Sequence, residues 1–185
     1  MFPILTIGFG IWSVSSERRV PKPPARMTTC IEIPSKASLV STVNQQDVKD
    51  TMHFLITGHT GFKGSWLSLL LRERGHQVSG IALNHDVNSL YDTTSMSELL
   101  KRDIRCDVRH LDKLQENFIA VNPDVVIHLA AQALVRESYK DPITTFDTNV
   151  LGTINVLKSS QKIKGLKAQL IITTDKVYKL SLIHI

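Results

Sequence analysis

Residues 54–64, with the sequence FLITGHTGFKG, decide the fold of this chain. A short apolar run leads into three glycines with the spacing G-x-x-G-x-x-G. The first glycine permits a tight turn, the second lets the backbone approach a pyrophosphate, and the third lets a helix pack close to the strand. We therefore expect a dinucleotide site in which backbone N–H groups and a helix dipole face the phosphates.

The segments on either side of the glycines support this interpretation. Residues 65–74 are a mostly apolar helix pattern with basic residues in the last turn, and Gly75 follows as a C-cap. Residues 77–83 then predict a second strand, which completes a βαβ unit. A phosphate-binding P-loop is excluded because Lys63 precedes Gly64 and Ser65, whereas that loop needs the order Gly-Lys-Ser/Thr.

Strands and helices continue to alternate after this unit. We predict strands at residues 103–108, 124–130 and 169–173, a helix at 111–121, and a helix that starts with Asp141 and Pro142 and carries apolar residues to position 157. Apolar strands separated by helices predict an α/β fold. It is a Rossmann-type, doubly wound parallel sheet with the strand order 3-2-1-4-5.

Composition narrows the classes of function. The 185 residues are 42% hydrophobic, and the formal net charge of +5 is spread without a basic run, so we expect no nucleic-acid partner. No segment reaches the roughly eighteen apolar residues of a membrane span, and we expect a cytoplasmic protein without a membrane partner. Cys30 and Cys106 lack metal-ligand spacing and are interpreted as reduced thiols, so no metal site is expected.

The two ends differ from the middle. For residues 1–51 we expect a disordered or non-native extension, because residues 13–51 have no hydrophobic periodicity. A transit-like segment and an upstream extension of the reading frame are the two forms that it could take. Met52 is the expected natural start. Residues 180–185 match an in-frame translation of a transposon-type sequencing adapter, which predicts a non-native tail after Lys179.

Polar residues follow the predicted strands, where ligands bind in such sheets. Asn84 is a candidate to hydrogen-bond the adenosine ribose hydroxyls. Alternatively, it is a plain turn residue and Asp86 supplies the acid. Because Asn84 carries no charge to repel a 2′-phosphate, it favours NAD over NADP only weakly. Asp107 is a candidate acceptor for the adenine amino group and, compatibly, a helix cap. His128 is interpreted as a satisfied core histidine rather than a catalyst, and Asn149 as a residue that holds backbone or water near the site.

Thr174, Asp175 and Lys176 come directly after the last strand. A hydroxyl, a carboxylate and an amine at that edge can polarise a substrate oxygen and move protons. A strand end with polar caps is an equally good interpretation of the same three residues.

Five pieces carry a family resemblance: TGHTGFKGSWLSLLL (57–71), DIRCDVR (103–109), HLAAQALVRESYKDP (128–142), TNVLGTINVL (148–157) and TTDKVY (173–178). With them, residues 52–179 resemble the NAD-binding, N-terminal part of an extended short-chain dehydrogenase/reductase of the sugar-nucleotide epimerase/dehydratase family. Within that family they are most similar to the CDP-glucose 4,6-dehydratases.

The resemblance implies a reaction and a cofactor. NAD is tightly held, the C4 hydroxyl of CDP-glucose is oxidised, water is lost across C5 and C6, and hydride returns to C6 to give CDP-4-keto-6-deoxyglucose. It implies that Thr174 hydrogen-bonds the C4 oxygen, that Asp175 helps to protonate the departing hydroxyl, and that Lys176 stands where relatives use a glutamate base. It also implies a homodimer.

The candidate binding residues, chosen from the residue pattern and from the resemblance together, fall into two groups. Those for NAD are Gly58, Gly61, Phe62, Gly64, Asn84, Asp107, Val108, Leu129, Ala130, Ala131, Gln132 and Asn149; those for the nucleotide sugar are Gln132, Arg136 and Tyr139. At Asn84 the chain departs from the family, whose members usually carry Asp or Glu nearby.

The chain departs from the family at its end. The family's Tyr-x-x-x-Lys pair is absent, because Tyr178 is followed four residues later by Leu182. We therefore expect a Rossmann domain truncated before the substrate-binding part, and a fragment without turnover. Another epimerase or dehydratase of the family, and a non-catalytic NAD-binding module, remain alternatives.

Overall fold

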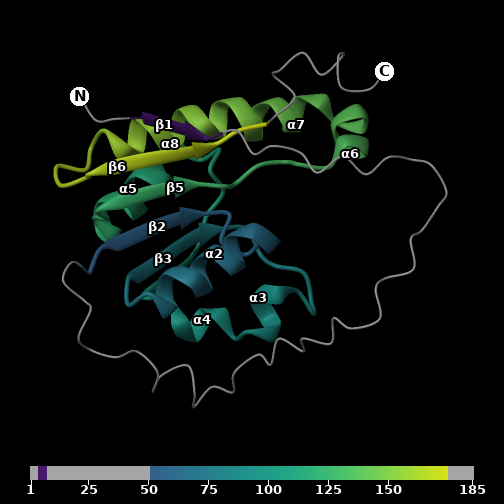
Figure 1. The fold of residues 1–185 in the computed structure, drawn as a ribbon. Helices are drawn as coiled ribbons and strands as arrows, with labels where there is room; N and C mark the ends of the chain where they lie inside the picture. The colour runs from purple at the N-terminus through teal and green to yellow at the C-terminus, as the bar shows by residue number, and fades with distance from the viewer. Residues whose placement is uncertain (1–3, 8–50, 175–185) are drawn as a thin grey trace, which may run out of the picture.

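The computed structural model describes residues 4–7 and 51–174 (Figure 1). Its strands are β1 (Ile4–Ile7), β2 (His53–Thr57), β3 (Gln77–Ala82), β4 (Arg102–Arg105), β5 (Val125–His128) and β6 (Ala168–Ile172). Its helices are α2 (Phe62–Glu73), α3 (Leu90–Thr93), α4 (Met96–Leu99), α5 (Leu111–Val121), α6 (Val135–Lys140), α7 (Pro142–Phe146), the π-helical segment η1 (Asp147–Leu151) and α8 (Gly152–Ser160).

All strand pairs in the sheet are parallel, and the spatial order is β1-β6-β5-β2-β3-β4. The five strands from β2 onward therefore have the order 3-2-1-4-5, which confirms the predicted fold class. The order reverses at β2, so the crevice at its carboxyl end is the expected ligand site. Sequence analysis did not predict β1, which pairs with β6 at the edge of the sheet.

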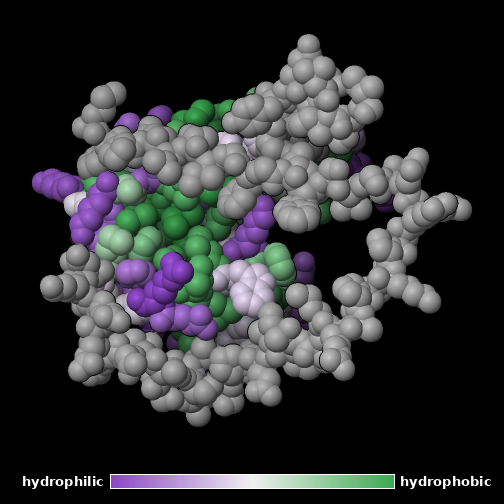
Figure 2. All heavy atoms as spheres, viewed as in Figure 1, coloured by the Kyte–Doolittle hydropathy of each residue, from purple (hydrophilic) through white to green (hydrophobic). Residues whose placement is uncertain are grey.

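Two apolar layers cover the sheet, and β2 divides its side chains between them. Leu55 belongs to the layer with α5 and α8, where Leu114, Phe118 and Val156 are fully buried. Phe54 and Ile56 belong to the opposite layer, which lies against α2, α3 and α4. Hydrophobic residues gather over the middle of the face seen in Figure 2, with hydrophilic residues beside them. Helices thus cover both faces, as the apolar strands require.

Several local predictions hold. The structure starts α5 at Leu111 and ends it at Val121, as predicted. Gly75 has φ +80° after the end of α2, and its N–H donates to the Arg72 carbonyl, so it closes the helix as expected. At α7 the Asp141 side chain accepts the Thr144 N–H, with Pro142 in the first turn.

Other boundaries were predicted wrongly. The second strand of the βαβ unit ends at Ala82, one residue early, and β4 ends at Arg105, so residues 106–108 already lie outside the strand. The stretch 84–101 holds the short helices α3 and α4. The helix expected beyond Pro142 changes to a π-helix over Asp147–Leu151 before α8. Within residues 4–7 and 51–174, no helix is long and apolar enough to cross a membrane.

Candidate functional site

The glycine loop between β2 and α2 is closely packed at two of its three glycines. Gly58 has φ +77°, and a Cβ there would lie 2.7 Å from the backbone nitrogen of Ala130. A Cβ on Gly64 would lie 2.2 Å from the Gly58 carbonyl oxygen. A Cβ on Gly61 would meet only that same oxygen, at 3.4 Å. The first and third glycines therefore permit the fold of the loop, while the second leaves its outer side open.

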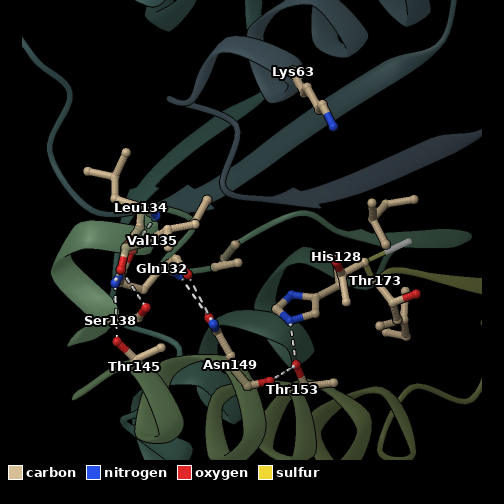
Figure 3. Close-up of a pocket in the computed structure, with 16 residues that line it drawn as sticks. Lys63, His128, Gln132, Leu134, Val135, Ser138, Thr145, Asn149, Thr153 and Thr173 are labelled. Carbon is tan, nitrogen blue, oxygen red and sulfur yellow. Dashed lines mark hydrogen bonds between the residues drawn. The ribbon is translucent and has the colours of Figure 1, made fainter. Parts of the chain in front are cut away.

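The loop presents a helix N-terminus to the crevice. Gly61 is the N-cap of α2 and provides no side-chain cap, and the first turn of α2 contains no acidic residue. Phe62 is exposed, and Lys63 projects from this turn toward the cleft in Figure 3. The positive end of the helix dipole and a lysine thus lie together, an arrangement that favours an anion such as a pyrophosphate.

A cleft of about 780 Å³ lies beyond the carboxyl ends of β5 and β6 (Figure 3). It brings together five of the predicted site residues: Ala130, Ala131, Gln132, Asn149 and Thr174. Its wall also includes polar residues that sequence analysis did not assign to the site: Lys63, Ser138, Thr145, Thr153 and Thr173. A cavity of this volume is in the range of small-molecule and cofactor sites.

Asn149 joins the two sides of this cleft. Its Oδ1 accepts the Gln132 N–H at 2.8 Å, and its Nδ2 donates to the Gln132 carbonyl at 3.0 Å. The Asn149 amide therefore binds both backbone groups of Gln132, in the way a neighbouring strand would. Asn149 lies in η1, and π-helical turns frequently occur at functional sites.

Gln132 uses its own side chain within the loop. Its Nε2 donates to the Leu134 carbonyl and to Thr145 Oγ1, and its Oε1 accepts the Leu134 N–H at 2.6 Å. The structure therefore gives Gln132 a role in shaping the wall of the cleft.

The Asn149 contact should contribute measurably to the stability of the fold. Asn149→Asp keeps an acceptor for the Gln132 N–H but places a carboxylate against the Gln132 carbonyl, so it should lower the free energy of unfolding by about 1–3 kcal/mol. Urea denaturation at pH 7 measures this. Asn88→Asp, at an exposed turn position, is the matched control. Equal stabilities of the two variants would contradict the clamp.

His128 connects β2, β5 and α8 below the cleft. Its Nδ1 lies 2.6 Å from Thr57 Oγ1, and its Nε2 lies 3.0 Å from Thr153 Oγ1. Because Thr153 donates its hydroxyl hydrogen to the Asn149 carbonyl at 2.7 Å, it accepts from His128, which places the proton on Nε2. Burial lowers the pKa of His128 from 6.5 to about 4. The ring is thus a neutral, hydrogen-bonded core group, as interpreted from the sequence.

The adenosine end of the expected dinucleotide site lies beyond β3 and β4. Asn84 is exposed two residues after β3, and Thr60 of the glycine loop donates to the Leu83 carbonyl at 3.3 Å. Asp107 accepts the Arg109 N–H and two bonds from the Arg109 side chain. The N-cap of α5 is His110, so Asp107 does not cap that helix, and the capping role expected from the sequence was wrong.

His59, inside the glycine motif, has a structural role that sequence analysis missed. Its ring is fully buried under β3, and its Nε2 donates to Asp103 at 2.8 Å. Asp103 also accepts from Tyr91 and from Arg105, which stacks over the Tyr91 ring. Burial lowers the pKa of His59, and although burial would raise that of Asp103, its hydrogen bonds hold the Asp103 pKa below the ordinary value. The motif's histidine thus anchors the loop to β4.

Other predicted residues lie away from the cleft. Arg136 and Tyr139 are on the exposed side of α6, which turns Val135 and Ser138 to the cleft instead. Val108 is buried in the core against Gly152, and Leu129 is half-buried beside Thr57. Asp175 and Lys176 lie outside the described residues. Thr153 could have been assigned to the cleft from the sequence, because it lies four residues after Asn149 and therefore on the same face of the helix.

The parallel sheet with its switch point at β2, the glycine loop and the polar cleft together define a Rossmann-type α/β domain. Residues 55–179 match the family model for GDP-mannose 4,6 dehydratase. The chain belongs to this family of sugar-nucleotide dehydratases and epimerases, which confirms the resemblance found in the sequence.

Known relatives agree with this placement. The chain is 45% identical over 124 residues to the CDP-glucose 4,6-dehydratase of Salmonella typhimurium, covering 66% of this chain and 34% of that protein. UDP-glucose 4-epimerase from Stenotrophomonas maltophila, solved with bound NAD, superposes with a TM-score of 0.57 at 26% identity, covering 69% of this chain and 38% of that one.

The UDP-glucose 4-epimerase of Thermus thermophilus, solved in complex with NAD, gives a TM-score of 0.52 at 29% identity, covering 60% and 34% of the two chains. The chain spans about a third of the length of the curated relatives it matches.

Proposed function

We propose that this chain is the NAD-binding part of a sugar-nucleotide 4,6-dehydratase whose substrate is CDP-glucose. The observation that carries the proposal is the glycine loop, where Gly58 and Gly64 have no room for a side chain and Gly61 leaves the outer face open. The choice of CDP-glucose rests on the 45% identity to a CDP-glucose 4,6-dehydratase.

The residues present fit a dinucleotide. Backbone N–H groups of the loop and of the first turn of α2 would hold the pyrophosphate, with Lys63 adding positive charge. Asn84 and Asp107 would receive the adenosine, and the cleft below Gln132 would receive the nicotinamide and the sugar. NAD, when bound, supplies the hydride acceptor that permits oxidation at C4 of the sugar.

The chain's own residues would orient the sugar. Thr173 and Thr174 follow β6 in the wall of the cleft, where the Thr174 hydroxyl would hydrogen-bond the C4 oxygen. Asp175 and Lys176 follow in the sequence, and we propose that they serve as proton donor and base for the loss of water. The neutral His128 fixes the floor of the cleft through Thr57 and Thr153 and takes no proton in this scheme.

We propose a homodimer for the whole protein. An exposed row of apolar side chains runs along α6, α7, η1 and α8: Tyr139, Ile143, Phe146, Val150 and Ile154. Exposed apolar patches of this kind mark protein–protein contacts.

Turnover by the whole protein tests the proposal. With NAD and CDP-glucose in D₂O, we expect a product that has lost one water and carries deuterium at C5, detected by mass spectrometry and NMR. UDP-glucose and GDP-mannose are the comparison substrates. Conversion of UDP-glucose to an isomer of unchanged mass would identify an epimerase, and NAD binding by calorimetry without any conversion would identify a non-catalytic module.

A further inference from the structure

Asn155, on α8, holds the turn that follows β4. Its side-chain Nδ2 donates to the Val108 carbonyl at 3.1 Å and to the Arg109 carbonyl at 3.0 Å. These two carbonyls come from a segment 46–47 residues earlier in the chain. Asn155 is thus a long-range clamp on a short irregular segment, and nothing in its helical pattern predicted it.

The clamped turn carries Asp107. The His110 N–H donates to the Asp107 carbonyl at 3.1 Å, so residues 107–110 form one tight turn with the Val108 and Arg109 carbonyls in its middle. Val108 is 5% exposed, and a Cβ on Gly152 would lie 2.7 Å from Val108 Cγ2, so α8 presses against the turn. Packing at Val108 fixes the position of the turn, and the Asn155 amide fixes its rotation.

The carboxylate on this turn is an acceptor held in one orientation. Its Oδ1 accepts the Arg109 N–H at 2.9 Å, and its Oδ2 accepts the Arg109 Nε–H at 2.9 Å and the Arg109 Nη2–H at 2.6 Å. Oδ1 therefore keeps one lone pair for a ligand. Burial alone would raise the Asp107 pKa, but the hydrogen bonds from Arg109 hold it below the ordinary value. The group therefore stays ionised and accepts hydrogen bonds only.

We infer that Asn155 is a positioning residue for recognition of the adenine base. By clamping the Val108 and Arg109 carbonyls, it aims the Asp107 carboxylate at the exocyclic amino group of a bound dinucleotide. The inference rests on the proposed NAD site. A carboxylate that accepts from an amino group rejects a base with a carbonyl in its place, because two acceptors then face each other.

Nicotinamide hypoxanthine dinucleotide, in which a carbonyl replaces the adenine amino group, tests this. The wild-type chain should bind NAD about 30-fold more tightly than this analogue, as expected for a hydrogen bond to a charged group. Asn155→Leu should reduce the preference to about threefold, and Asn155→Ser, which retains one donor, should lie between. Calorimetric titration with both dinucleotides measures the ratio, and thermal melting verifies the fold of each variant.

Two controls separate aiming from general stability. Lys158→Leu, at an exposed position one turn further along α8, should keep the wild-type ratio. In an Asp107→Asn background, Asn155→Leu should leave the ratio unchanged, because both residues act on one contact.

The outcomes are distinct. A wild-type chain that binds neither dinucleotide refutes the proposed NAD site and the inference with it. Equal wild-type affinities for the two dinucleotides overturn the adenine contact alone. A third outcome is that Asn155→Leu weakens the affinity for both dinucleotides equally and so keeps their ratio. In that case Asn155 supports the fold only, and the inference is overturned. If the leucine variant does not melt cooperatively, Asn155→Ser is judged by the same criterion.

Discussion

Gly64→Ala is expected to lower the free energy of unfolding by about 2–3 kcal/mol and to remove measurable NAD binding. The new Cβ would lie 2.2 Å from the Gly58 oxygen, 2.6 Å from the His59 Cα and 2.9 Å from the Gly58 carbonyl carbon. These are backbone atoms, so no side-chain rotation relieves the clash. The loop must move away from α2, and with it the N–H groups proposed to hold the pyrophosphate.

Helix propensity predicts the opposite sign, which makes the experiment decisive. Gly64 lies inside α2, where alanine is ordinarily more stable than glycine by about 0.5–1 kcal/mol. A variant at least as stable as wild type would therefore refute the close approach of α2 to the loop. Gly165→Ala is the matched control, since a Cβ added there would meet nothing within 4 Å, and it should leave unfolding and NAD titration unchanged.

The sheet was predictable because its central strands, β2, β3 and β5, are largely buried on both faces. Runs such as residues 54–57 and 125–128 are apolar without alternation, and the segments between them have lengths typical of helical crossovers. Strand ends were less predictable. Cys106 and Val108 are apolar like strand residues, but they lie in the segment after β4. They are buried because they pack against α5 and α8. Burial by a neighbouring helix leaves the same apolar signal as burial in a sheet.

Site residues were predictable where their structural role depends only on neighbours in the sequence. The three glycines and the Asp141-Pro142 cap are of this kind. Contacts between distant segments were not predictable, because the partner of His59 is Asp103 and that of Asn155 is the turn at Val108. The π-helical turn over Asp147–Leu151 was not predicted either, and Asn149 within it contacts Gln132, which lies 17 residues earlier. Arg136 and Tyr139 show the remaining limit, since the phase of the short helix α6 decides which side chains meet the cleft.

Acidification from pH 7 to pH 4 is expected to destabilise the fold, and proton binding linked to His128 should account for a loss of about 3 kcal/mol over this range. Burial lowers its pKa to about 4 in the folded chain, against 6.5 in the unfolded chain. Between these values the unfolded chain binds a proton at this residue and the folded chain does not, so added protons favour unfolding. The stability that depends on a neutral His128 is therefore complete above pH 6.5 and is lost as the pH falls toward 4.

Urea denaturation of wild type and His128→Gln across this range isolates the contribution. The variant should be less stable at pH 7, because Thr57 and Thr153 lose their shared partner, yet its stability should fall less steeply with acid. His53 and His59, whose pKa values are also lowered by burial, maintain a residual slope in both proteins. Parallel curves for the two proteins would contradict a buried neutral imidazole.

The carboxylates do not confuse this measurement. Asp103, Asp107, Asp124 and Asp141 all have lowered pKa values in the folded chain, so they stabilise it above the ordinary carboxyl pKa and lose that effect as the pH falls. Wild type and His128→Gln share these four residues, so their effect cancels in the comparison. NAD titration along the same series separates two effects. If binding weakens in step with the His128 contribution, the floor of the cleft and the cofactor site are one cooperative unit; if binding is constant until the chain unfolds, the two are independent.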